Sequence, residues 1–134
     1  MADKLRFSLV SPDRELFAGE VDQVVAPGAE GEFGVLPNHA PFMTVLKPGP
    51  LRIFEGGQVR RMFVNGGFAD VTPEGLTVLA EDAVDLAQVA PEALAQQRQD
   101  AAEDLQDAKD EAARGAAEAR LARLDALVAA LAAG

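Results

Sequence analysis

A chain of 134 residues can form one compact domain with an appendage and is too short for a large enzyme. Its formal net charge of -10 opposes phosphate backbones and anionic lipid headgroups, which argues against a nucleic-acid partner. The chain has no cysteine, which excludes disulfides and thiol nucleophiles and indicates the cytoplasm. We find no signal peptide and no run of about 20 apolar residues, so we expect peripheral membrane association without direct insertion.

The first ninety residues have the pattern of short strands. Leu5, Phe7 and Leu9 alternate with polar residues, which is the period-two pattern of a strand with one buried face. More short β-rich segments follow, separated by glycine and proline, at 21–25, 42–46, 51–54, 58–64 and 76–80.

Two turn sequences join these strands into hairpins. Gly56 and Gly57 predict a two-residue turn, because both can adopt positive φ. The run from Thr72 to Gly75 predicts another, with Pro73 presetting φ. Many short strands without an intervening helix predict an antiparallel β-sandwich or flattened barrel over residues 1–87 and exclude a parallel α/β fold.

Residues 88–134 predict a two-helix antiparallel hairpin. Pro91 suits a first helical position, and Gly115 is expected to end the first helix. The apolar stripes recur at intervals of three and four residues or at heptad spacing. They comprise Leu94, Ala101, Leu105, Ala108 and Ala112, then Ala117, Leu121, Leu124, Leu127, Val128 and Leu131.

The predicted hairpin is weakly held, because alanine buries little apolar area at roughly 25 cal/mol per Å². Since Gly115 is the one expected breaker, a single long helix is an alternative state.

Two features suggest chemistry and are better explained by structure. The glycines between Gly28 and Gly34 lack the spacing of a phosphate-binding loop and carry two carboxylates. His39, the only histidine, has no cysteine partner and no serine nearby in sequence, which argues against catalysis. Metal binding by His39 with Glu30 and Glu32 has no recognised spacing. We therefore expect no cofactor, and a structural or protein-contact role for this histidine.

One stretch identifies a family resemblance. From Val25 to Phe42 the chain closely resembles the G-x-x-G-x-x-G-x-x-P-x-H-A-P signature of the epsilon subunits of bacterial F-type ATP synthases. The segments 66–71 and 76–83 resemble the second signature block of that family. The resemblance is strong over residues 5–90 and rests on architecture alone over the helices.

The resemblance implies a non-catalytic rotor subunit of the central stalk of a proton-transporting synthase. Its partners would be the gamma subunit and the c-ring, with the alpha and beta subunits added if the helices extend. It would lie on the cytoplasmic face of the inner membrane. The matching loop implies that Glu30, Glu32 and His39 face the ring, with Asn38 where the family often has glycine.

Relatives can inhibit ATP hydrolysis by inserting basic helices into the catalytic head. The last helix here has only Arg114, Arg120 and Arg123, opposed by two acids, and the first helix is acidic, so we predict weak or absent inhibition.

Some relatives bind ATP through a Leu-Asp-x-x-Arg-Ala motif. Residues 94–99 keep only Leu94 and Arg98 of that motif, so Arg98 is a remnant and we predict no tight nucleotide binding. Two alternatives remain: a free-standing ATP-sensing regulator, which would not co-purify with gamma, and a small hydrolase using His39, which would need a nucleophile.

Overall fold

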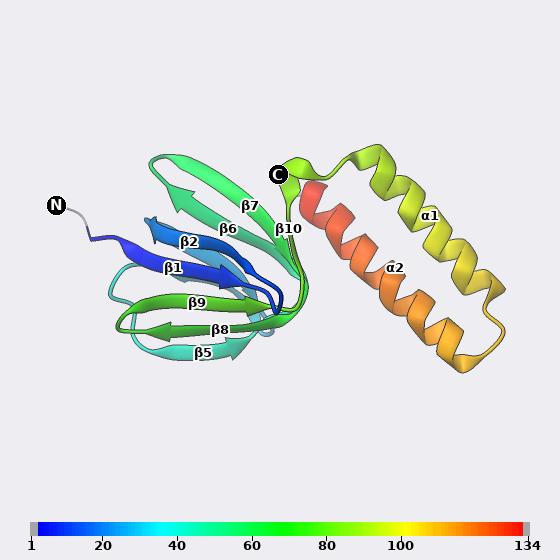
Figure 1. Ribbon diagram of the computed structural model, residues 1–134, viewed down its shortest axis with the longest axis horizontal. Helices are drawn as coiled ribbons and strands as arrows, with labels where there is room; N and C mark the ends of the chain where they lie inside the picture. The colour runs from blue at the N-terminus through cyan, green and yellow to red at the C-terminus, as the bar shows by residue number, and fades with distance from the viewer. Residues whose placement is uncertain (1–2, 133–134) are drawn as a thin grey trace. The chain divides into compact units, whose positions relative to one another are not determined.

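The computed structural model describes residues 3–132, which form two compact units that divide between Asp85 and Leu86 (Figure 1). The first is a two-layered β-sandwich and the second contains two helices. The boundary predicted from the sequence at 87/88 stays a prediction about which residues fold independently.

Within residues 3–132, ten strands build the sandwich as two five-stranded sheets. One sheet has the order β2-β1-β9-β8-β5, and the other has the order β10-β7-β6-β3-β4. The strands are β1 Leu5–Val10, β2 Glu15–Val21, β3 Gln23–Gly28, β4 Gly31–Val35, β5 Phe42–Val45, β6 Gly49–Glu55, β7 Gln58–Val64, β8 Gly67–Thr72, β9 Gly75–Ala80 and β10 Ala83–Asp85. The β-sandwich predicted from the sequence is therefore confirmed.

Every pair among these ten strands is antiparallel except one. β1 pairs with β9 in parallel, with Phe7 beside Leu76 and Val10 beside Leu79. Two strands joined by a tight turn must run antiparallel. Most of the domain lies between β1 and β9 in sequence, so the connection between them does not fix their relative direction. The antiparallel pattern expected from the hairpins therefore has this exception at the centre of one sheet.

Both predicted hairpin turns are present. Glu55 pairs with Gln58 across Gly56 and Gly57, whose φ angles are 59° and 82°. Thr72 pairs with Gly75 across the second turn.

The core lies between the two sheets. Leu5, Phe7 and Leu9 are all buried, as their alternation predicts. Equivalent inward positions on the facing sheet include Val24, Leu51 and Ile53, which are also buried.

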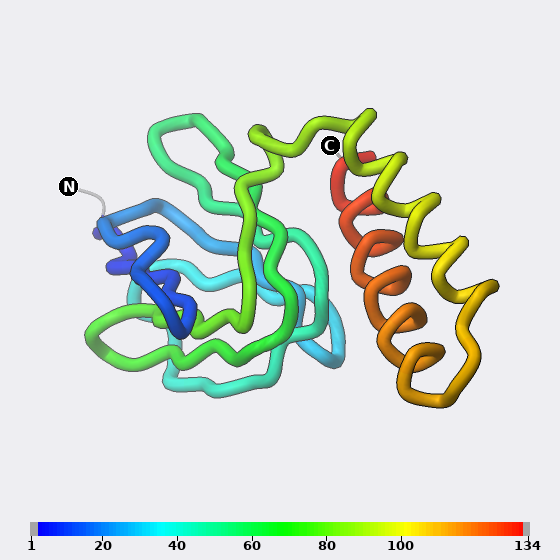
Figure 2. The backbone as a smooth tube through the Cα atoms, turned by 45° about the vertical axis from the view of Figure 1, so that its right-hand side comes forward, coloured from blue at the N-terminus to red at the C-terminus, as the bar shows by residue number. Residues whose placement is uncertain are grey.

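The second unit begins with a short 3₁₀ turn, η1 Leu86–Gln88, followed by α1 Pro91–Asp107 and α2 Glu111–Ala132. Pro91 occupies the predicted first position of α1. The two helices run side by side in opposite directions (Figures 1 and 2), so the predicted hairpin is confirmed.

The predicted break at Gly115 is wrong, because Gly115 lies inside α2 and the chain bends at 108–110. Ala108 has an extended ψ of 130°, and Asp110 caps the next helix by accepting a 2.7 Å hydrogen bond from the N–H of Ala113. A helical glycine costs only about 1 kcal/mol, so a good cap a few residues earlier determines where the helix starts.

The buried face of the hairpin differs in part from the predicted stripes. Ala112 and Val128 are exposed, while Leu105, Leu121 and Leu131 are half-buried. The buried positions are Leu94, Ala101, Ala117, Leu124, Leu127 and Ala130.

Candidate functional site

The four residues predicted to contact a partner fall into two groups. Glu30 lies in the turn between β3 and β4, and Glu32 is on β4, whereas Asn38 and His39 follow the end of that strand. Five extended residues span roughly 16 Å, so β4 separates Glu30 from Asn38 and His39. The arrangement does not gather Glu30, Glu32 and His39 around one point, as joint metal binding would require.

The first group is an exposed acidic corner. Glu32 forms an ion pair with Arg52 on β6, with 3.1 Å between the carboxylate and guanidinium groups, while Glu30 is exposed in the turn. The N–H of Ala29 donates to the carbonyl of Val45 at 2.9 Å, so this turn borders the end of β5.

The second group lies in the 36–41 loop. Nδ1 of His39 is 2.7 Å from the carbonyl oxygen of Ala40, to which it can only donate. The His39 ring lies 6.3 Å from the ring of Phe42, which stacks edge-on against Phe33 at 5.4 Å. These contacts are typical of a structural histidine. The hydrogen bond to the carbonyl of Ala40 occupies one ring nitrogen of His39 and does not orient the ring toward a nucleophile.

An apolar row that the sequence analysis missed crosses the outer face of the first sheet. The strand register places Val45 beside Phe68, and Phe68 beside Leu79. Their exposed fractions are 62%, 40% and 36%. Met43, 64% exposed, lies in the adjacent row on β5. We call Val45, Phe68 and Leu79 the apolar row.

The signal for this row was present in the sequence. β5 reads Phe-Met-Thr-Val, which does not alternate between apolar and polar residues. A strand with apolar residues on both faces either is buried on both sides or leaves one apolar face for a partner. Only the register across β5, β8 and β9 shows that these residues form one continuous row.

A groove of about 620 Å³ lies between α1 and α2. Its lining is mostly apolar, with Arg98 and Asp125 as the charged members, and these two side chains form an ion pair across the hairpin. A second interhelical pair joins Arg120 to Asp104 at 3.3 Å. Arg98 already has an anionic partner here, which does not favour phosphate binding.

None of the helices within residues 3–132 is long and apolar enough to cross a membrane.

Comparison with known proteins adds family relationships to this geometry. Residues 4–86 match the family model described as the ATP synthase delta/epsilon chain, beta-sandwich domain. An ATP synthase epsilon chain of Maricaulis maris is 55% identical over 127 residues, which cover 95% of this chain and 96% of that protein. A chain of the Euglena gracilis mitochondrial ATP synthase, solved by cryo-EM as an OSCP/F1/c-ring assembly, has a TM-score of 0.82 and 31% identity. The alignment covers 96% of this chain and 81% of that one.

A third relative is much shorter. The ATP synthase epsilon chain of Caulobacter vibrioides is 63% identical over 84 residues, which make up 98% of that protein but only 63% of this chain. That relative is therefore about as long as the sandwich unit alone.

Proposed function

The chain belongs to the ATP synthase delta/epsilon chain family, and from this premise we propose that it is the epsilon chain of a bacterial F-type ATP synthase. It is a non-catalytic subunit of the central stalk. Its proposed partners are the gamma subunit and the c-ring, which hold it peripherally at the cytoplasmic face of the inner membrane.

The observation that carries this proposal is similarity over nearly the whole chain. The Maricaulis relative aligns over 95% of the length, so the helices as well as the sandwich are included. A rotor component needs a rigid body with contact surfaces. The sandwich provides the rigid body, because its apolar core is buried between two sheets.

We propose that the apolar row packs on gamma. Exposed contiguous apolar side chains on a small monomeric protein mark protein–protein contact sites, and Val45, Phe68 and Leu79 form such an alignment on the first sheet. The adjoining turn with Glu30 gives this surface a polar rim.

Polar contacts with the ring are proposed for Glu30, Glu32, Asn38 and His39. Because β4 separates Glu30 from Asn38, the two ends of the strand require separate tests.

The absence of cysteine makes site-specific cross-linking straightforward, since each introduced cysteine is unique in the chain. In the assembled synthase, Phe68→Cys should cross-link to gamma, and cysteines at positions 30 and 38 report separately on the ring. Val59→Cys is the matched control, because Val59 is 50% exposed on β7 in the other sheet.

Co-purification tests the proposal itself. Tagged chain should recover gamma in a one-to-one ratio, and Val45→Asp should weaken that recovery. Recovery of a chain free of gamma, or cross-linking of Phe68→Cys to its own helices, would contradict the proposed assignment.

A further inference from the structure

Asn38 has an uncommon backbone conformation. Its φ is 65°, and it is the only non-glycine residue with positive φ in the part of the chain that the structure describes. L-residues other than glycine avoid this left-handed region, and asparagine is among the few that tolerate it.

The side chain of Asn38 also makes a long-range contact. Its Nδ2 donates a 2.8 Å hydrogen bond to Oδ2 of Asp3, just before β1. Within residues 3–132, this is the only hydrogen bond from the 36–41 loop to a distant segment.

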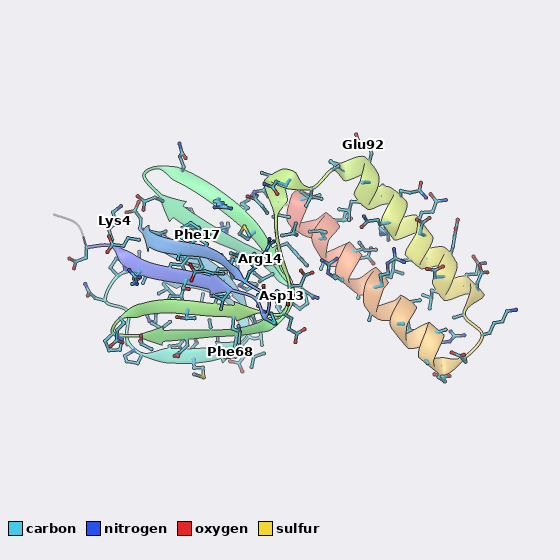
Figure 3. All side chains as sticks on the ribbon, viewed as in Figure 1. Lys4, Asp13, Arg14, Phe17, Phe68 and Glu92 are labelled. Atoms are coloured by element: carbon cyan, nitrogen blue, oxygen red, sulfur yellow. The ribbon has the colours of Figure 1, made fainter. Side chains whose placement is uncertain are left out.

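Asp3 is itself anchored through its neighbour. Lys4 forms ion pairs with Asp22 at 2.5 Å and with Glu55 at 3.2 Å. Asp22 in turn accepts a 2.9 Å hydrogen bond from the N–H of Gly56. The segment at Asp3 and Lys4 therefore joins the 36–41 loop to the β2–β3 corner and the β6–β7 hairpin at one end of the sandwich. Lys4 and Asp13 mark opposite ends of this body (Figure 3).

We propose that Asn38 is a positioning residue: its hydrogen bond to Asp3 fixes the 36–41 loop, and with it His39, in the orientation in which the loop meets a polar partner surface. This rests on the proposed function for the partner, but the tether itself does not. Without the tether, the ring contact between His39 and Phe42 and the local bond from His39 to Ala40 would remain for the loop within residues 3–132.

Four substitutions separate the roles of backbone and side chain. Asn38→Gly keeps the left-handed conformation and removes the hydrogen bond, whereas Asp3→Ala removes only the acceptor. Asp3→Asn keeps an acceptor oxygen and should restore the tether. Asp13→Ala is the matched control, because it removes the same charge from an exposed position in the bend between β1 and β2.

The first measurement is made on the isolated full-length chain by ¹⁵N relaxation. The amide order parameters of Asn38, His39 and Ala40 should lie near 0.85 in the wild type, the Asp3→Asn variant and the Asp13→Ala variant, and should fall below about 0.6 in Asn38→Gly and Asp3→Ala. Unchanged order parameters in Asp3→Ala would overturn the tether.

The second measurement is the affinity of each variant for ATP synthase that has been prepared from the same organism and stripped of this chain. Asn38→Gly and Asp3→Ala should each weaken binding about three- to tenfold, and combining them should add little further loss. The melting temperature should stay unchanged, which separates positioning from folding. A loosened loop with wild-type affinity would overturn the positioning role. Failure of the wild type to bind would refute the proposed function, while the relaxation data would still decide the tether.

Discussion

Two glycines illustrate how differently the addition of a single Cβ atom can affect the structure. Gly67 has a φ of 110°, and a Cβ at this position would lie 1.9 Å from the carbonyl oxygen of Leu79. Gly115 lies inside α2, and a Cβ added there would meet no atom within 4 Å from the described residues outside its own turn of helix. Gly67 is therefore required by close packing of backbone against backbone, whereas Gly115 is an avoidable cost in a helix.

These positions give opposite predictions for alanine. Gly67→Ala should destabilise the sandwich by at least about 3 kcal/mol, because both the clash and the backbone strain must be relieved by moving β9. Gly115→Ala should stabilise the hairpin by roughly 0.5–1 kcal/mol. Urea unfolding of the full chain measures both, and a destabilised Gly115→Ala variant would contradict the open surroundings of Gly115.

The ion pair of Lys4 and Asp22 predicts a pH dependence. The Lys4 ammonium, and next the N–H of Gly56, hold the pKa of Asp22 below its ordinary value of 3.8. Hydrogen bonds to Asp22 and Glu55 raise the pKa of Lys4 above 10.5. The stabilisation of the folded state by the Asp22 carboxylate is therefore present above the ordinary pKa of this group. It is lost as the pH falls through the lower pKa that Asp22 has in the folded protein. For Lys4 it is present below 10.5 and is lost as pH rises through the higher folded value.

Asp22→Asn should accordingly lower the melting temperature near neutral pH, and the difference from wild type should shrink in acid, below about pH 4. Scanning calorimetry across the pH range checks this, with Asp13→Asn as the control. A difference that stays constant from neutral pH into strong acid would exclude the assigned cause.

At the scale of the element, the sequence predicted strands and turns better than the helical break. The strand at 5–10 and the turn at Gly56 and Gly57 follow from local rules, alternation and positive φ, that the fold does not override. Glycine often ends helices, so the sequence predicts the break at Gly115. Asp110 instead caps α2, and the chain bends next to it. Local propensity gave the number of helices, and the capping hydrogen bond decided their boundary.

Asp110→Ala should destabilise the hairpin by about 1 kcal/mol, because Ala113 would lose the acceptor for its N–H. The helical signal in circular dichroism at 222 nm should then melt at a lower temperature. Asp107→Ala is the matched control, since it removes an acid from the last position of α1, where negative charge is unfavourable. Equal melting of the two variants would show that the cap does not hold the bend.

The groove between the helices predicts no tight nucleotide binding. Arg98 is paired with Asp125, and the other lining residues are apolar. Calorimetry should therefore detect no binding at low micromolar ATP. The variant Asp125→Ala removes the ion-pair partner of Arg98 and so tests more strictly whether the groove can bind ATP. Micromolar affinity for ATP in the wild type would refute the prediction.

At the scale of the molecule, the family signature predicted the architecture but not the apolar row. Period-two patterns report which residues of one strand face inward. The row exists only because β5 pairs in register with β8, which follows it about twenty residues later, and β8 pairs with β9. The same limit explains the candidate site, since Glu30 and His39 are close in sequence but lie beyond opposite ends of β4.

The short Caulobacter relative bears on the helices. A protein that bears the name of an ATP synthase epsilon chain is about as long as the sandwich unit alone. We predict that synthase carrying a chain truncated after Val89 assembles and hydrolyses ATP at nearly the rate of the full-length complex. A several-fold rise in ATPase rate on truncation would contradict the weak inhibition expected from the acidic helices.

The parallel pairing of β1 with β9 has a consequence for biosynthesis. β1 leaves the ribosome well before its partner β9, residues 75–80, so that edge of β1 stays unpaired until most of the sandwich has been translated. Non-local pairing of this kind slows folding, because a long loop must close before the contact forms. Nascent chains arrested before β9 should therefore remain sensitive to protease.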